Sequence, residues 1–141
     1  MKSEKAFTLI ELMVVVVIIS ILAAIAIPNF IRMQTRAKEA DVKEVAHAVL
    51  LSAECYKTIP GGDGLKPVNV AQLAVELPSG ITTKRNPFRS TETYSPGSAL
   101  VNNNPAGDGH VAYWFQSQTD PYTILVRGAN GVMILTLSAE T

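Results

Sequence analysis

The residue with the most distinctive chemical setting in this chain is Glu11. It is the only charged residue of an otherwise apolar run, FTLIELMVVVVIISILAAIAI, which covers residues 7–27. A carboxylate in such a run costs on the order of several kcal/mol unless a cation or a hydrogen-bond donor meets it. The question that the sequence raises is therefore which group pairs with Glu11.

The other residues with catalytic or ligating side chains form no recognisable set. His47 and His110 lie far apart in the sequence, and Cys55 is the only cysteine, so zinc, haem and Cys–x–x–Cys signatures are excluded. Asp108, Asp120 and the carbonyls near Pro121 do not reproduce the spacing of a calcium loop. We expect solvated loop carboxylates there, and we expect no enzyme activity, no cofactor and no metal.

The apolar run is long enough to cross a membrane. About twenty-one helical residues span roughly 32 Å, the thickness of a hydrocarbon core. The run is preceded by MKSEKA, in which the small residue Ala6 comes before the run. A secretory signal peptide has its small residues after the apolar stretch. An ordinary N-terminal anchor, with its lysines on the cytoplasmic side, is the simple alternative.

The segment Ala6-Phe7-Thr8-Leu9-Ile10-Glu11-Leu12, followed by the apolar run and Ile27-Pro28, closely resembles the N-terminal signal of type IV pilins and type II secretion pseudopilins. The resemblance implies that a prepilin peptidase cleaves between Ala6 and Phe7 and that the new N-terminus of Phe7 is methylated. This chain has Ala6 where the family usually has glycine before the cleaved bond. It also has Ser20 where many members have glycine.

The expected cleavage gives Glu11 a partner. The new α-amino group of Phe7 would be cationic below a pKa of roughly 8. We expect Glu11 of one subunit to pair with the Phe7 amine of a neighbour, which would neutralise both charges in an apolar bundle and set the axial register. The alternative is that the Glu11 carboxylate extends to the membrane surface.

Composition agrees with a small anchored domain. The 141 residues carry twelve basic and twelve acidic side chains, which become ten and eleven without Lys2, Glu4 and Lys5. No strong field would attract nucleic acid, so we predict no direct nucleic-acid binding. The single Cys55 cannot form the intrachain disulfide found in many type IV pilins, and we expect it to be buried on a helix.

The pattern of apolar residues predicts one long helix and three strands. Residues 29–56 hold no glycine or proline, and Val42, Val45 and Val49 begin a stripe that continues through Ser52 and Tyr56. Pro28 should kink this helix of about fifty residues, roughly 75 Å long. A short helix is expected over 68–76, started by Asn69 and stopped by Pro78, and residues 86–109 read as a loop.

The C-terminal part predicts an antiparallel sheet. Strands are expected over 111–117, 122–127 and 132–137, with a four-residue hairpin loop at 128–131. The aromatic residues of this part, Tyr113, Trp114, Phe115 and Tyr122, are expected to serve packing. The resulting fold is α+β: a long N-terminal helix packed against a small antiparallel sheet, as the resemblance to type IV pilins also implies.

We therefore divide the chain into a leader (1–6), a hydrophobic transmembrane and assembly helix (7–28) and a globular head (29–141). The head comprises an amphipathic helix half (29–57), a variable connecting loop (58–110) and a β-meander (111–141). Phe7, Glu11 and Pro28 are the residues expected to serve assembly.

The resemblance implies a structural pilin that polymerises through its N-terminal helix. Its expected partners are further copies in a helical filament, the prepilin peptidase, the assembly machinery of the inner membrane, and lipid before assembly. It would be a single-pass inner-membrane protein first and then part of an extracellular pilus used in adhesion, motility or secretion. The alternatives are a major-type pseudopilin, located in the periplasm, and a membrane-anchored binding domain that does not polymerise.

Overall fold

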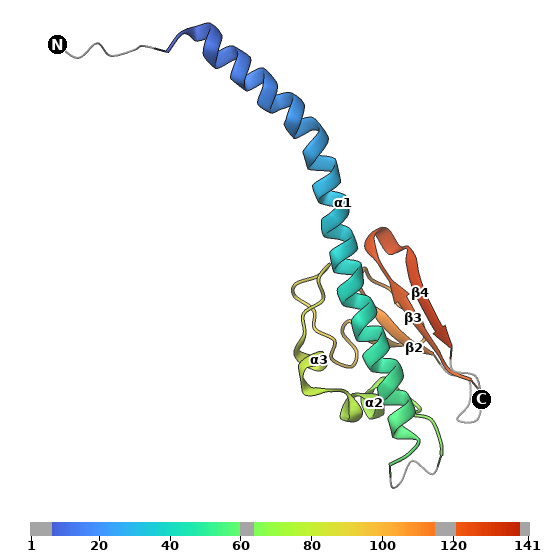
Figure 1. Cartoon of the computed structure of the whole chain (residues 1–141). Helices are drawn as coiled ribbons and strands as arrows, with labels where there is room; N and C mark the ends of the chain where they lie inside the picture. Colours follow the sequence, from blue (N-terminus) through green and yellow to red (C-terminus); the bar gives the residue numbers. More distant parts are fainter. Residues whose placement is uncertain (1–6, 60–63, 115–120, 139–141) are drawn as a thin grey trace, which may run out of the picture. The chain divides into compact units, whose positions relative to one another are not determined.

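The structure is a computed structural model that describes residues 7–59, 64–114 and 121–138. The chain divides into two compact units, Met1–Arg36 and Ala37–Thr141 (Figure 1). The first unit holds the apolar half of the long helix α1. The second holds the other half of α1 and every other element, and it begins eight residues after the start expected for the head, at residue 29. We call this second unit the head from here on. The predicted leader, including Ala6, lies outside the described residues.

Helix α1 covers Leu9–Tyr56, 48 residues, and confirms the single long helix. It contains Pro28 and continues through it, because one missing N–H removes only one bond of the helical ladder. In the head, α1 buries one stripe of side chains: Val42, Val45, Ala46, Val49, Ser52 and Ala53. This is the predicted stripe, apart from Tyr56, which is only partly buried.

Two short helices follow in the connecting region. Helix α2 covers Val70–Glu76, and the Asn69 side chain accepts a hydrogen bond of 3.0 Å from the Gln72 N–H, as expected of an N-cap. Helix α3 covers Ser79–Thr83 and was not predicted. Pro78 follows the C-cap of α2, Leu77, and is itself the N-cap residue of α3, where its missing N–H removes no bond of either helix.

The sheet has four strands in the order β1-β2-β3-β4. Their ranges are Leu100–Asn102, Val111–Trp114, Thr123–Arg127 and Met133–Ser138. Strands β2, β3 and β4 pair antiparallel, as predicted, although residues 115–117 of the first expected strand lie outside the described residues. The turn between β3 and β4 takes positive φ at Asn130 and Gly131, not at Gly128.

The prediction of a purely antiparallel sheet was wrong at one edge. β1 pairs parallel to β2, with Leu100 opposite Val111, so the sheet is mixed. This three-residue strand lies in a stretch rich in Asn, Pro, Ser and Gly that was expected to be loop. Residues 100–102 form a strand because they pair with β2, and this pairing cannot be predicted from the local sequence.

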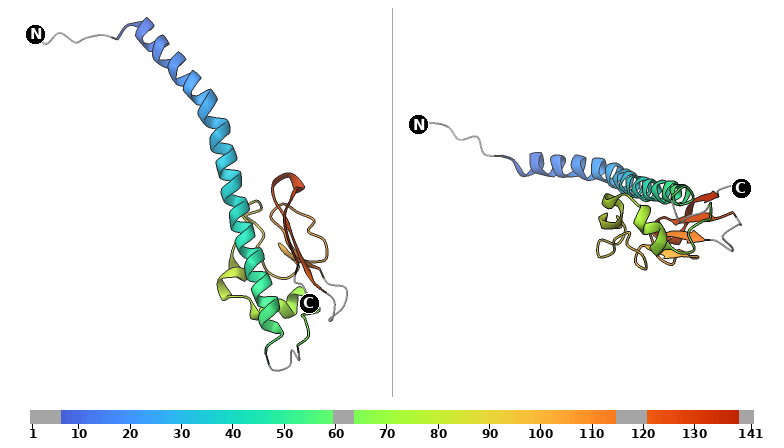
Figure 2. Two further views of the ribbon diagram at one scale, coloured as in Figure 1. Left: turned by 45° about the vertical axis from the view of Figure 1, so that its right-hand side comes forward. Right: turned by 90° about the horizontal axis from the view of Figure 1, so that it is seen from below.

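The hydrophobic core lies between the C-terminal half of α1 and one face of the sheet (Figure 2). Residues at alternate positions of the strands enter it: Tyr113, Ile124 and Val126 are fully buried. The Tyr122 hydroxyl links the two layers, because it donates a hydrogen bond of 2.5 Å to Glu54 on α1. The core therefore rests on α1 from Val42 onward, and the apolar half of the helix is not needed to build it.

Candidate functional site

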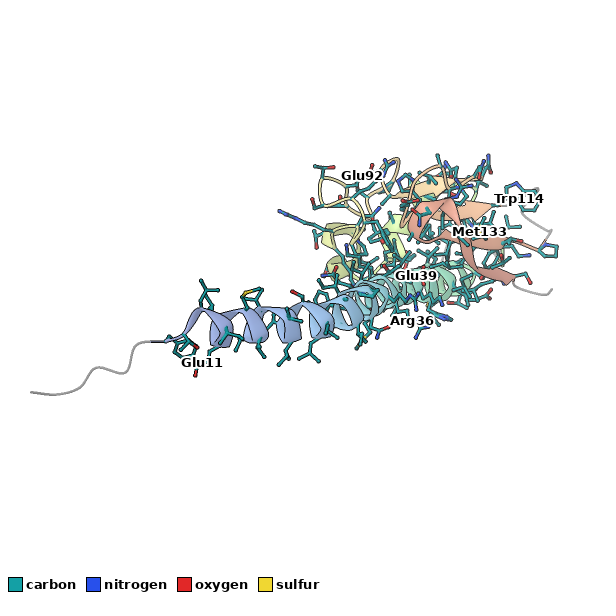
Figure 3. The ribbon with its side chains drawn as sticks, turned by 90° about the horizontal axis from the view of Figure 1, so that it is seen from above. Glu11, Arg36, Glu39, Glu92, Trp114 and Met133 are labelled. Atoms are coloured by element: carbon teal, nitrogen blue, oxygen red, sulfur yellow. The ribbon has the colours of Figure 1, made fainter. Side chains whose placement is uncertain are left out.

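The candidate site is the N-terminal half of α1, where Glu11 lies in the first helical turn (Figure 3). The Glu11 oxygen Oε2 accepts two hydrogen bonds from Thr8, one of 2.9 Å from the backbone N–H and one of 2.6 Å from the hydroxyl. In return the Glu11 N–H donates to the Thr8 hydroxyl oxygen at 3.3 Å. The two side chains thus form a reciprocal capping box.

The capping box explains why α1 begins where it does. The first N–H groups of a helix have no partner within the helix, and Thr8 and Glu11 satisfy two donors at this end. A carboxylate in the first turn is also favoured by the positive end of the helix dipole. Our sequence reasoning missed this role, although the Thr-x-x-Glu pattern before an apolar run is its known signal.

Glu11 keeps one carboxylate oxygen for another partner. Both bonds from Thr8 go to Oε2, and within the described residues Oε1 has no hydrogen-bond donor. Phe7, the other residue expected at this end, precedes α1 and is 76% exposed. The bond expected to be cleaved joins Phe7 to Ala6, which lies outside the described residues.

The apolar side chains that follow Glu11 are turned outward around the whole helix. Within the described residues, α1 is the one helix long and apolar enough to cross a membrane, and the most apolar 18-residue window has a mean hydropathy of 3.0 with none of it buried. Leu12, Ile18 and Ile25 are each more than half exposed. A helix that is apolar all round requires lipid or other helices as its surroundings.

Ser20 and Pro28 lie within this apolar surface. The Ser20 hydroxyl donates a 2.8 Å hydrogen bond to the Val16 carbonyl four residues earlier, so its polar group is satisfied inside its own helix. Pro28 donates no N–H, which leaves the ladder one bond short at the end of the apolar run. The structure thus places Glu11 and Pro28 in the same helix, at the two ends of the apolar run.

The remaining candidate residues do not come together. His47 lies on the exposed face of α1, whereas His110 is buried beside Glu92 in the head. Asp108 does not form a calcium loop in the described residues, because its carboxylate accepts a 2.7 Å bond from the Gly131 N–H. Asp120 lies outside them. No cluster of three metal-ligating side chains occurs in the described ranges.

The prediction that Cys55 is buried was wrong. Its side chain is exposed on α1. The buried stripe runs through Ser52 and Ala53, and at about 100° per residue Cys55 lies about 60° from Ser52 and about 160° from Ala53, outside the edge of the stripe. Helical spacing alone does not determine which residues in the last turn of α1 face the sheet.

Comparison with known proteins identifies the family of this chain. Residues 1–27 match the family described as the prokaryotic N-terminal methylation motif. The chain is 38% identical over 104 residues to the type IV narrow pilus major component PilA5 of Thermus thermophilus, covering 74% of this chain and 82% of that protein. The chain belongs to the type IV pilin family.

Other type IV pilins match a shorter part of this chain. The type IV major pilin protein PilA of Myxococcus xanthus is 67% identical over 53 residues, which is 38% of this pilin but 24% of that protein. The type IV wide pilus major component PilA4 of Thermus thermophilus is 40% identical over 57 residues, 40% of this pilin and 44% of that protein. No solved structure matches this pilin.

Proposed function

We propose that this pilin is the structural subunit of a type IV pilus filament and polymerises through residues 7–28 of α1. The observation that carries the proposal is the helix that is apolar all round, is unburied within the subunit and begins with a capped carboxylate. The relatives named as pilus major components support the same function.

Assembly would exchange lipid for other copies of the helix. Before assembly the apolar side chains lie in lipid, which is as apolar as they are, so no hydrophobic gain drives helices together. Close packing and polar pairs must supply the difference. We propose that β-branched side chains such as Val14 and Ile18 provide the packing and that Glu11 provides the polar pair.

The partner of Glu11 would arise from processing. A prepilin peptidase would cleave between Ala6 and Phe7 and leave a methylated amine at Phe7. In a neighbouring subunit this cation could approach the Glu11 oxygen Oε1, while Thr8 keeps Oε2 and the carboxylate orientation. A charge that is paired in this way favours one axial register over the others, a role documented for buried polar groups.

The proposed life cycle has two locations. The unassembled pilin would be a single-pass protein of the inner membrane, where lipid surrounds residues 7–28 and the assembly machinery extracts it. The assembled pilin would be extracellular. A periplasmic pseudopilin or an anchored binding domain is a weaker proposal, because the relatives that match are named as components of pili.

The test is to look for filaments made of this subunit in its native host. Negative-stain electron microscopy with an antibody against the head should show labelled extracellular filaments, and deletion of the gene should remove them. Short labelled fibres confined to the periplasm would support the pseudopilin instead. Labelled membranes without any filament would contradict polymerisation.

A further inference from the structure

We infer that Asn130 is a latent site of spontaneous deamidation and that the side chain of Asp108 keeps it unmodified in the folded head. Asn130 is followed by Gly131, and this is the only Asn-Gly pair in the sequence. The pair lies in the turn between β3 and β4, where Asn130 is exposed. The turn therefore presents a chemically reactive pair to solvent, and the fold determines how fast it reacts.

Deamidation of an Asn-Gly pair needs no enzyme. The backbone nitrogen of the glycine loses its proton and attacks Cγ of the asparagine side chain, and the proton and the amide group leave together as ammonia. The five-membered succinimide then takes up one water at either carbonyl, which gives aspartate or isoaspartate. Glycine favours the attack because it has no Cβ to hinder its nitrogen.

The backbone of Asn130 opposes closure of the succinimide ring. Its φ of 56° and ψ of 29° lie in the left-handed region, which asparagine adopts more readily than most residues. Since the substituents of a tetrahedral carbon are about 120° apart, this ψ leaves the Gly131 nitrogen about 150° from the Asn130 Cβ around the Cα–C bond. Ring closure requires both atoms on the same side. The attack therefore requires the peptide plane between the two residues to rotate.

Asp108 resists that rotation. Its carboxylate oxygen Oδ1 accepts a hydrogen bond of 2.7 Å from the Gly131 N–H. A hydrogen bond to an ionised carboxylate is stronger than one between neutral groups, and this one occupies the nitrogen that would attack. The position of Asp108 is itself restrained, because its carbonyl accepts a 2.9 Å bond from the buried Asn86 side chain.

The group that would be attacked has no comparable restraint. Within the described residues, the side-chain amide of Asn130 has no hydrogen-bond partner. Protection therefore depends on the backbone of the turn and on Asp108, and not on the side chain that reacts. Local opening of the turn would remove both restraints together.

Modification at this turn would disturb the last strand of the sheet. Isoaspartate at position 130 would lengthen the main chain by one carbon between β3 and β4, whose pairing holds the buried Val126 opposite Leu135. Aspartate there would add a second carboxylate next to the Gly131 N–H that Asp108 binds. The hydrogen bond from Gly131 to Asp108 thus preserves both the chemistry of the turn and the register of the hairpin.

The test measures deamidation of the full chain in detergent, at neutral pH and physiological temperature. Peptide mass spectrometry distinguishes an acid from an amide at position 130 and follows the acid over time. We expect Asn130 to react more slowly in the folded chain than in the chain unfolded by urea. Asp108→Ala should raise the rate in the folded chain by about tenfold or more, because a hydrogen bond to a charged group is lost.

Glu92→Gln is the matched control for this experiment. It weakens a different loop contact of the head and leaves Asp108 and Gly131 unchanged, so Asn130 should react as in wild type. Circular dichroism melting checks that both variants are folded. Amide hydrogen exchange on wild type adds a measurement that needs no variant: the Gly131 N–H should exchange slowly, because Asp108 binds it.

Equal rates in the folded and unfolded wild-type chains would overturn the inference, as would a Gly131 N–H that exchanges as fast as in the unfolded chain. A folded Asp108→Ala chain that reacts no faster than wild type would also overturn it, and a slower reaction would show that the carboxylate acts as a base. An equal increase in Glu92→Gln would assign the effect to general loosening of the head instead. Filament formation is not measured, so each outcome is independent of the assembly function proposed above.

Discussion

The His110 imidazole nitrogen Nε2 lies 2.8 Å from a carboxylate oxygen of Glu92, and this contact joins the connecting loop to the start of β2. The Arg89 guanidinium donates to the other oxygen of Glu92 at 2.9 Å. The Arg89 hydrogen bond, supported by His110, outweighs the opposing effect of burial and lowers the pKa of Glu92. Ionised Glu92 therefore stabilises the folded head.

A carboxyl group with a lowered pKa stabilises the fold above its ordinary pKa of about 4.3 and loses that contribution as the pH falls through the folded-state value. We predict that Glu92→Gln lowers the free energy of unfolding by about 1 kcal/mol at neutral pH. The difference from wild type should vanish in acid. Denaturant titration followed by circular dichroism at both pH values measures this.

Glu44→Gln is the matched control for that experiment. The Glu44 carboxylate also pairs with a cation, Lys84, at 2.5 Å, but its side chain is 66% exposed, against 24% for Glu92. Solvent screens such a pair, so the control should lose little stability. Equal losses in the two variants would show that the loop contact has no special role.

The second prediction concerns Glu11. Glu11→Ala should reduce filament yield by about tenfold or more, because it removes both the capping partner and the proposed pair with Phe7 of a neighbour. Membrane fractionation and head-specific antibody binding should be unchanged, since the core begins at Val42. Sheared pili are quantified by immunoblot.

Thr8→Val separates the two roles of Glu11. It removes the hydroxyl of the capping box but leaves the carboxylate charge, so filaments should still form at reduced yield. If Glu11→Ala filaments were as abundant and stable as those of wild type, the carboxylate would have no part in assembly.

The third prediction concerns processing. The mature protein from its native host should begin at Phe7 and carry one methyl group on the amine, as the match of residues 1–27 to the methylation motif suggests. Intact-mass spectrometry gives the answer directly. Partial processing is compatible with Ala6 in place of glycine, whereas a population that starts only at Met1 would refute cleavage at this bond.

The fourth prediction concerns the head alone. A fragment that starts at Asn29 keeps all of the buried stripe of α1, and none of the described residues that it loses (7–28) is buried in the subunit. It should be a soluble monomer that unfolds cooperatively, as judged by circular dichroism melting and sedimentation. An unfolded fragment, or one that forms filaments, would contradict the division between assembly and folding.

The fifth prediction concerns Gly109, which has a φ of 73°. A Cβ atom there would lie 2.2 Å from the Asn86 side-chain oxygen, and the Gly109 carbonyl accepts a bond from the buried Tyr94 hydroxyl. Gly109→Ala should lower the free energy of unfolding by about 2 kcal/mol or more. Gly80→Ala on α3, where a Cβ meets nothing within 4 Å, should not destabilise the head.

Several features could be predicted from the sequence because their causes are local. The apolar run, the stripe that begins at Val42 and the cap at Asn69 depend on residues within one or two helical turns. The Thr8–Glu11 capping box is equally local, since its two residues lie three positions apart. The family likeness of residues 6–28 has the same local character.

Other features exist only through contacts between distant segments. β1 is a strand because Leu100 meets Val111, and the exposed position of Cys55 depends on which face of α1 the sheet covers. The depression lined by Asn103, Trp114 and Thr123 also needs three separate segments. Sequence by itself determined where the long helix runs and which of its halves is apolar, since periodicity and hydropathy are properties of one segment. Only the tertiary structure determined the surface of the head, because that surface is formed where segments far apart in the chain come together.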